Sequence, residues 1–126
     1  MKLRLDSNGA QNIFTAYGDG FVELNKSSRY ERSIIVLADR VIDNWGQGGV
    51  SGLSSEDIRQ LAALAPAIVL LGTGSRQRFP SATLLRPLIE AQVGYEVMDL
   101  MAACRTYNLL AGEGRRAAAA LLFDRP

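Results

Sequence analysis

The stretch from Val69 to Pro80, VLLGTGSRQRFP, places a glycine turn directly after an apolar run and follows it with two arginines. Backbone amides in a glycine turn can hold an anion, and arginine side chains add charge-assisted hydrogen bonds to phosphate or carboxylate oxygens. In α/β sheets, ligands bind beyond the carboxyl ends of parallel strands, where this turn is expected to lie. The candidate anion-binding residues are Gly72, Thr73, Gly74, Arg76 and Arg78.

The spacing of this turn matches neither of the two common phosphate-binding loops. The dinucleotide-binding fingerprint needs a glycine where the chain has Gln77, and the Gly-Lys-Ser/Thr sequence of a Walker loop does not follow. Pro80 also separates the turn from the next expected helix, which weakens a site built on a helix dipole. The turn is equally well explained as a tight strand-to-helix connection, so both interpretations stay open.

A second group of polar residues lies in the stretch 95–122. Glu96 falls within an apolar strand, where a buried carboxylate needs a partner, and Arg105 on the following helix is the natural candidate. Asp99 comes just after this strand, and Asn108 shares a helix face with Arg105 at a spacing of three. A closed pair of Glu96 and Arg105 would indicate scaffold. An open Glu96 facing a cavity would indicate a ligand site, with Glu96 or Asp99 as the acid–base group.

Histidine is absent from the chain, and cysteine occurs once, at Cys104. These absences exclude Ser-His-Asp and Cys-His catalytic centres, and a zinc site of cysteine and histidine ligands. A lone thiol beside Arg105 can be a nucleophile of lowered pKa, but its helical spacing with Leu100 and Tyr107 favours a small core residue. We expect no catalytic residue, no metal and no cofactor.

The charges of the 126-residue chain are nearly balanced, with 14 basic and 13 acidic residues and a net charge of +1. This balance indicates no nucleic-acid or anionic-membrane partner. The N-terminal sequence MKLRLDSNGA has no signal-peptide core, and the apolar stretch 62–71 is too short to span a bilayer. We expect one domain over residues 1–126, a cytoplasmic location and no stable membrane insertion, and a homodimer stays open.

Strands and helices are expected to alternate, which indicates an α/β fold with a mixed sheet covered by helices. Helices are expected from Ser54, where Asp57 completes a near capping box, and from an Asp99 cap to Gly112. A further helix is expected over about 81–91, and Pro87 inside it implies either a kink or a late start. Residues 12–24 are typical of a β-hairpin that turns at Asp19-Gly20. Further strands are expected at 33–38, 67–71, 94–98 and 117–123.

Several short segments occur together and in order: GTG at 72–74, FP at 79–80, EVMD at 96–99, AACRTYN at 102–108 and EGRR at 113–116. In this combination the chain resembles the family of small α/β domains, of undefined bacterial function, that includes mitochondrial complex I assembly factor 3. The resemblance implies a compact three-layer domain with a mixed central β-sheet flanked by helices, and it implies no established reaction. The mitochondrial members of this family resemble helpers that assemble the respiratory NADH dehydrogenase through protein contacts, so the resemblance also implies a role of that kind. The residues that match the family pattern are Gly72, Thr73, Gly74, Phe79, Pro80, Glu96, Asp99, Cys104, Arg105, Thr106, Tyr107, Asn108, Glu113 and Arg115.

We therefore expect a non-enzymatic protein-binding module, with a respiratory assembly client as one candidate for its protein partner. The alternative is a small-anion or small-ligand site, an enzyme included, in the crevice at the 72–74 turn. The predicted binding residues are Gly72, Thr73, Gly74, Arg76, Arg78, Phe79, Glu96, Asp99, Arg105 and Asn108.

Overall fold

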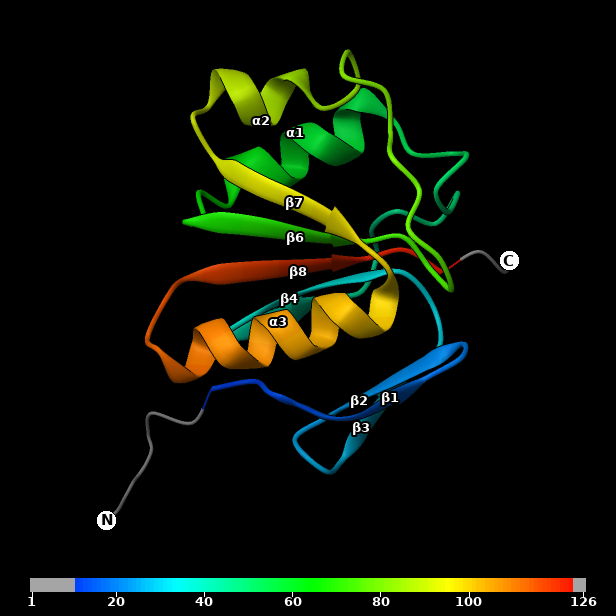
Figure 1. Cartoon of the computed structure of the whole chain (residues 1–126), viewed down its shortest axis with the longest axis vertical. Coiled ribbons are helices and arrows are strands. Elements are labelled where there is room, and N and C mark those ends of the chain that lie inside the picture. Colours follow the sequence, from blue (N-terminus) through cyan, green and yellow to red (C-terminus); the bar gives the residue numbers. More distant parts are fainter. Residues whose placement is uncertain (1–10, 124–126) are drawn as a thin grey trace.

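The computed structural model describes residues 11–123 and shows a central sheet with the strand order β5-β4-β8-β6-β7 (Figure 1). β6 runs parallel to both β7 and β8, whereas β4 pairs antiparallel with β5 and with β8. The sheet is therefore mixed, as predicted, and β5 and β7 are its edge strands. The strands are β4 (Ile34–Leu37), β5 (Arg40–Ile42), β6 (Ile68–Gly72), β7 (Gly94–Met98) and β8 (Ala117–Leu121).

The central strands are apolar on both faces because both faces of the sheet are covered. In β6, Leu70 belongs to the core cluster on one face, whereas Val69 and Leu71 belong to the cluster on the other. β8 has the sequence AAAAL, and all of it is buried. Its small side chains leave room for a helix to lie close to the middle of the sheet.

Two helices, α1 (Ser55–Ala63) and α2 (Arg86–Glu90), cover one face of the sheet. α1 begins with the predicted capping box: the Ser54 hydroxyl accepts from the Asp57 amide at 3.1 Å, and the Asp57 carboxylate accepts from the Ser54 amide at 3.0 Å. Trp45 is buried in the same cluster, and its ring nitrogen donates to the Asp57 carbonyl at 2.9 Å.

The other face is covered by α3 (Leu100–Gly112) and a small sheet of the strands β1 (Phe14–Gly18), β2 (Phe21–Leu24) and β3 (Ser28–Tyr30). Figure 1 shows α3 running alongside the strands of the central sheet, with the small sheet next to it. The rings of Phe14 and Tyr107 meet edge to face, with centroids 5.3 Å apart. The molecule therefore has helices on one face of the central sheet, and a helix with a second sheet on the other.

The structure confirms the predicted α/β class, with a mixed central sheet, flanking helices and an N-terminal hairpin. The hairpin is not part of the mixed central sheet, because its two strands form a separate antiparallel sheet with β3. The second helix starts late and spans Arg86–Glu90, because Pro87 lacks an amide and is tolerated only in the first turn of a helix. β3 and β5 were not predicted, since each has only three residues. The N-terminal segment inspected for a signal peptide lies outside the described residues.

Candidate functional site

The loop of residues 73–80 follows the carboxyl end of β6, and a buried threonine shapes it. The Thr73 hydroxyl donates to the Arg76 carbonyl at 2.7 Å and accepts from the Arg78 amide at 2.9 Å. The Thr73 amide donates to the Met98 carbonyl at 2.8 Å. Thr73 therefore folds the loop on itself and fastens it to the end of β7.

Gly72 and Gly74 allow the close packing and the turn at this point. A Cβ on Gly72 would lie 2.9 Å from Cδ2 of Leu121 and 3.0 Å from Cβ of Ala103, so a larger residue would push α3 and β8 away. Gly74 has a φ of 81°, and its carbonyl accepts from the Leu100 amide at 2.8 Å. The turn thus connects the loop directly to the first residue of α3.

Glu96 and Arg105 do not form the closed ion pair that was one of the two alternatives for them. Both residues are exposed, and no ion pair joins them in the described part of the chain. β7 is an edge strand, so the Glu96 carboxylate is solvated and needs no buried partner. Of the two arrangements that the sequence left open, the structure therefore has the open one.

Asp99 and Asn108 are engaged in holding the fold. The Asp99 carboxylate accepts from the Ala102 amide at 2.9 Å and caps α3, as predicted. Asn108 accepts from the Phe14 amide at 2.9 Å and donates to the Phe14 carbonyl at 2.8 Å. Its side-chain amide therefore pairs with β1 much as a neighbouring strand would.

Cys104 is fully buried on the face of α3 that contacts the central sheet and the small sheet. Burial raises the pKa of its thiol to about 12, against an opposing effect of the Arg105 charge. A cysteine nucleophile must be a thiolate, and this one stays protonated at neutral pH. The geometry therefore favours the core-residue interpretation over the nucleophile.

Phe79 is the most exposed of the large apolar side chains in residues 11–123, at 73%. It borders a hollow of about 400 Å³ between the 73–80 loop and β7. Glu96 lines this hollow, which is the open arrangement that we associated with a site. The other main lining residues are Pro80, Leu85, Tyr95 and Val97.

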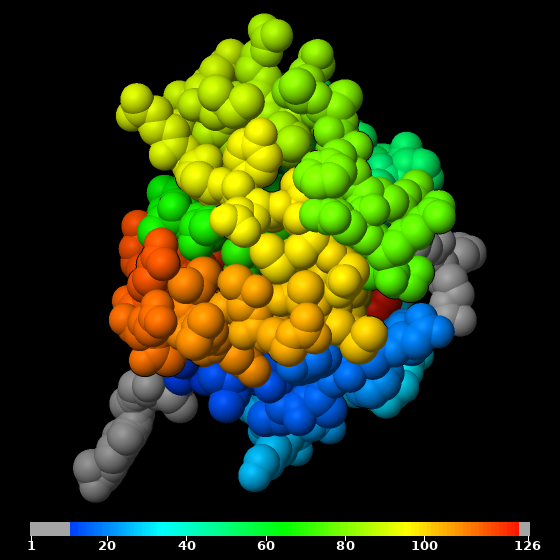
Figure 2. All heavy atoms as spheres, viewed as in Figure 1, coloured from blue at the N-terminus to red at the C-terminus, as the bar shows by residue number. Residues whose placement is uncertain are grey.

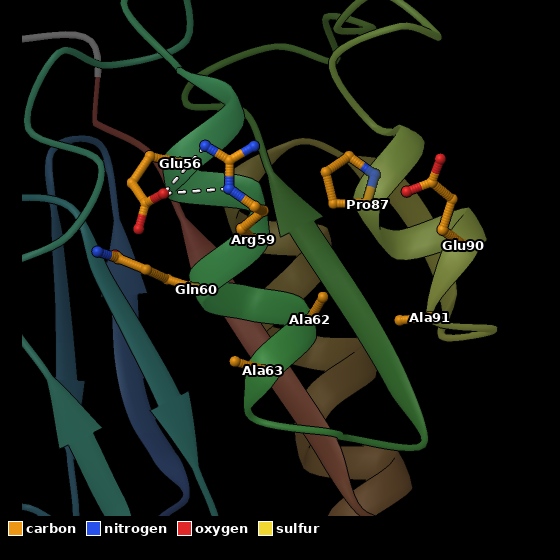
Figure 3. A pocket seen from close by; sticks show the side chains of 8 residues that line it. All are labelled: Glu56, Arg59, Gln60, Ala62, Ala63, Pro87, Glu90 and Ala91. Atoms are coloured by element: carbon orange, nitrogen blue, oxygen red, sulfur yellow. Dashed lines mark hydrogen bonds and ion pairs between the residues drawn. The ribbon is translucent and has the colours of Figure 1, made fainter.

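A larger hollow of about 670 Å³ lies between α1 and α2, away from the predicted residues (Figure 3). Two alanines of α1 and Ala91, just after α2, line it. Among its charged residues, Glu56 forms an ion pair with Arg59 at 3.1 Å. None of the predicted binding residues lines this hollow.

The structure gathers most of the predicted residues at one end of the central sheet. Gly72, Thr73 and Gly74 form the turn and Asp99 caps α3, whereas Arg76, Phe79 and Glu96 are exposed. Arg105 lies further along α3, and Asn108 turns toward β1.

Sequence reasoning missed Gln77, whose side-chain amide donates to the Val97 carbonyl at 2.8 Å. It also did not predict that Tyr95 and Val97 line the hollow beside Phe79. No local signal marks them, because only the strand order puts β7 at an edge.

Within residues 11–123, no helix is both long enough and apolar enough to cross a bilayer. In the same range, no group of three or more histidine, cysteine or acidic side chains is arranged to hold a metal ion.

Relatives of known name include both membrane and assembly proteins. The "13 kDa major membrane protein" of Francisella tularensis is 28% identical over 91% of this chain and 94% of its own length. "NADH dehydrogenase [ubiquinone] 1 alpha subcomplex assembly factor 3" of Danio rerio is 39% identical over 62% of this chain. The protein of the same name from Xenopus tropicalis is 33% identical over 94% of this chain. This chain spans 46% of the length of the Danio rerio protein and 66% of the length of the Xenopus tropicalis protein. The cytoplasmic location of this chain stays a prediction, since one relative is named a membrane protein.

The fold also occurs in solved structures. A crystal structure of a Bordetella parapertussis protein superposes with a TM-score of 0.84 at 39% identity, covering 94% of this chain and all of that one. The model of the family described as "Protein of unknown function (DUF498/DUF598)" matches residues 14–122. The matched residues include the turn after β6, the edge strand β7 and all of α3. The relatives named assembly factor 3 confirm the family resemblance that the sequence motifs predicted. The chain therefore belongs to the DUF498/DUF598 family.

Proposed function

We propose that this chain is a non-enzymatic protein-binding module that assists the assembly of a larger complex, with the respiratory NADH dehydrogenase as the leading client. The observation that carries the proposal is the exposed Phe79 on a loop that the buried Thr73 holds in shape. Aromatic side chains presented on rigid supports are typical anchors of protein interfaces. The names of the vertebrate relatives support the assembly role.

The docking surface that we propose, the Phe79 surface, consists of Arg76, Arg78, Phe79 and Glu96. Arginine and aromatic residues are enriched in interfaces and dominate their binding energy. Arg76 and Glu96 are both exposed, and Glu96 lines the hollow beside Phe79. Gly72, Thr73 and Gly74 then act through the shape of the turn, and Asp99 acts through the cap of α3.

A small-ligand site at the same turn is the second candidate, and the Glu96 carboxylate at the hollow favours it. It is weaker as a phosphate cradle, because the Thr73 amide and hydroxyl are already bonded within the protein. Cys104 also offers it no nucleophile, since the thiol is buried and protonated.

The proposal is tested by affinity capture from detergent-solubilised respiratory membranes, with quantitative mass spectrometry of the captured subunits. We expect Phe79→Ala, and separately Arg76→Ala with Arg78→Ala, to lower the capture of NADH dehydrogenase subunits about tenfold, as loss of an interface anchor does. Leu109→Ala is the matched control, because Leu109 is also an exposed apolar side chain, at 63%, but lies late in α3.

Thermal unfolding of each variant establishes that it is folded before capture is compared. If folded variants of the Phe79 surface retain every partner of the native chain, the proposed surface is wrong. If NADH dehydrogenase subunits are absent from the captured proteins, the client is wrong.

A further inference from the structure

The outer edge of β7 carries backbone groups that no strand of residues 11–123 pairs with. In a parallel ladder, alternate residues direct both of their backbone polar groups to the same side. The Met98 carbonyl accepts from Thr73 on the β6 side, so Glu96 and Gly94 also face β6. Tyr95 and Val97 therefore direct their amides and carbonyls away from the sheet.

Gln77 forms a hydrogen bond with one of these outward backbone groups. Its side-chain amide donates to the Val97 carbonyl at 2.8 Å, as the amide of an added strand would. The Tyr95 amide, the Tyr95 carbonyl and the Val97 amide lie on the same edge. An exposed edge of this kind is a ready template for another extended chain.

The hollow beside Phe79 runs along this edge, since Tyr95, Glu96 and Val97 line it together with Phe79 and Leu85. Figure 2 shows β7 (yellow) at the surface, between α3 (orange) and the yellow-green segment that leads into α2. An extended peptide presents alternate side chains to opposite sides, so every second side chain of an added strand would face the apolar part of the hollow.

We propose that the β7 edge binds an extended segment of a partner protein, which adds to the central sheet beside Tyr95 and Val97. Its apolar side chains alternate into the hollow against Phe79 and Leu85, and a lysine or arginine lies opposite Glu96. Backbone hydrogen bonds supply affinity and the side-chain positions supply specificity, as in other cases of strand addition. This inference rests on the proposed protein-binding function and specifies its partner.

The charge of the edge favours a basic partner strand. Glu96 is exposed and forms no ion pair in the described part of the chain, so its charge is available to a partner. Opposite charges directly across a strand pair stabilise it, and like charges destabilise it.

The same argument disfavours a second copy of this chain as the occupant. Glu96 is the middle residue of β7, Gly94–Met98. A two-fold antiparallel pairing over the full length of both strands would set Glu96 opposite its own copy. The repulsion of the two carboxylates opposes that dimer, whereas a basic strand meets no such repulsion.

The test uses the full chain and the end-blocked peptide Thr-Val-Lys-Val-Thr-Val-Lys-Val-Thr, followed by amide hydrogen exchange in NMR. We expect the peptide to slow exchange at the outward amides of Tyr95 and Val97 about tenfold or more at saturation. A matched peptide with glutamate in place of lysine is expected to bind about two- to fivefold more weakly, as a charge pair across strands implies.

Glu96→Lys is expected to reverse this preference between the two peptides. The substitution changes an exposed side chain and leaves the backbone of the edge intact. Glu90→Lys is the matched control, because it makes the same charge change on an exposed residue of α2 and should leave the preference unaltered.

Unchanged exchange at Tyr95 and Val97 with the lysine peptide, or equal binding of both peptides, overturns the proposal. Protection of these amides in the chain alone that rises with its concentration also overturns it, in favour of a second copy. If the Phe79 variants lose the captured client while these amides exchange freely in the client complex, strand addition fails and the protein-binding function stands.

Discussion

Cys104 illustrates how burial decides the chemistry of a single residue. Its thiol and the Tyr107 hydroxyl are both inside the core cluster that α3 shares with the small sheet. Burial raises the pKa of each group to about 12, with the Asp39 charge adding to the effect on Tyr107. Both groups are therefore neutral in the folded protein throughout the physiological pH range.

These raised pKa values predict a loss of stability in alkali. Well below pH 9 both groups are protonated in the folded and the unfolded chain, so they add no pH dependence there. Above the unfolded values of 9.0 and 10.0, the unfolded chain releases protons that the folded chain keeps. The free energy of unfolding should then fall toward pH 12, by about 1.4 kcal/mol per pH unit for Cys104 above pH 9 and by the same again for Tyr107 above pH 10.

The measurement is urea unfolding of the native chain and of Cys104→Ala between about pH 9 and 11. The alanine variant lacks one of the two groups, so its stability should fall less steeply by about 1.4 kcal/mol per pH unit once the unfolded thiol is ionised. Equal slopes for the two proteins would mean that the Cys104 thiol is not buried as a neutral group.

At the scale of elements, the contact of α3 with the central sheet depends on small residues. Gly72 at the end of β6 meets Ala103 of α3 and Leu121 of β8, and a Cβ there would also lie 3.3 Å from the Leu100 backbone. Backbone cannot give way as the end of a flexible side chain does, so this position is tightly constrained.

Gly72→Ala is therefore expected to lower the free energy of unfolding by about 1–3 kcal/mol, as overpacking of a core does. Gly112→Ala is its matched control at the other end of α3, where an added Cβ meets nothing within 4 Å. That substitution should raise stability by about 0.4–1 kcal/mol, because alanine restricts the unfolded chain. Denaturant unfolding of both variants measures the two effects, and a neutral Gly72→Ala would show that α3 and β8 have room to move apart.

The long element α3 also carries the attachment of the small sheet. Asn108 bonds both backbone groups of Phe14, and the Tyr107 hydroxyl donates to the Asn12 carbonyl at 3.0 Å. These bonds join segments about ninety residues apart in the chain, so the small sheet depends on α3 for its position.

At the scale of the whole molecule, the prediction of one domain over the chain has a direct consequence. The two core clusters lie on opposite faces of the same central strands, so neither cluster can be lost without exposing the sheet between them. We expect urea to unfold both clusters in one transition, with a slope of about 1–3 kcal/mol/M.

Trp45 fluorescence reports the cluster under α1 and α2, whereas far-UV circular dichroism reports the helices and strands on both faces, α3 included. The midpoints of the two signals should coincide. Separate midpoints would mean that α3 and the small sheet unfold as a unit of their own, contrary to a single domain.

The local elements were largely predictable because their signals are local. The capping residues Ser54 and Asp99 and the Asp19-Gly20 turn act within a few residues of themselves, and each has the predicted role. The short strands β3 and β5 escaped prediction because three residues are too few for a pattern to emerge. The motifs from the 72–74 turn to 113–116 likewise predicted the family to which the chain belongs.

The sequence by itself therefore determined the class of fold, the helix caps and the family. Only the tertiary structure decided what the candidate residues do, because that depends on the order of strands in the sheet. β8, the last strand in the described chain, inserts between β4 and β6 and leaves β7 at the edge. At an edge Glu96 is solvated and available to a partner, whereas in the middle of the sheet it would have needed Arg105 or another buried charge.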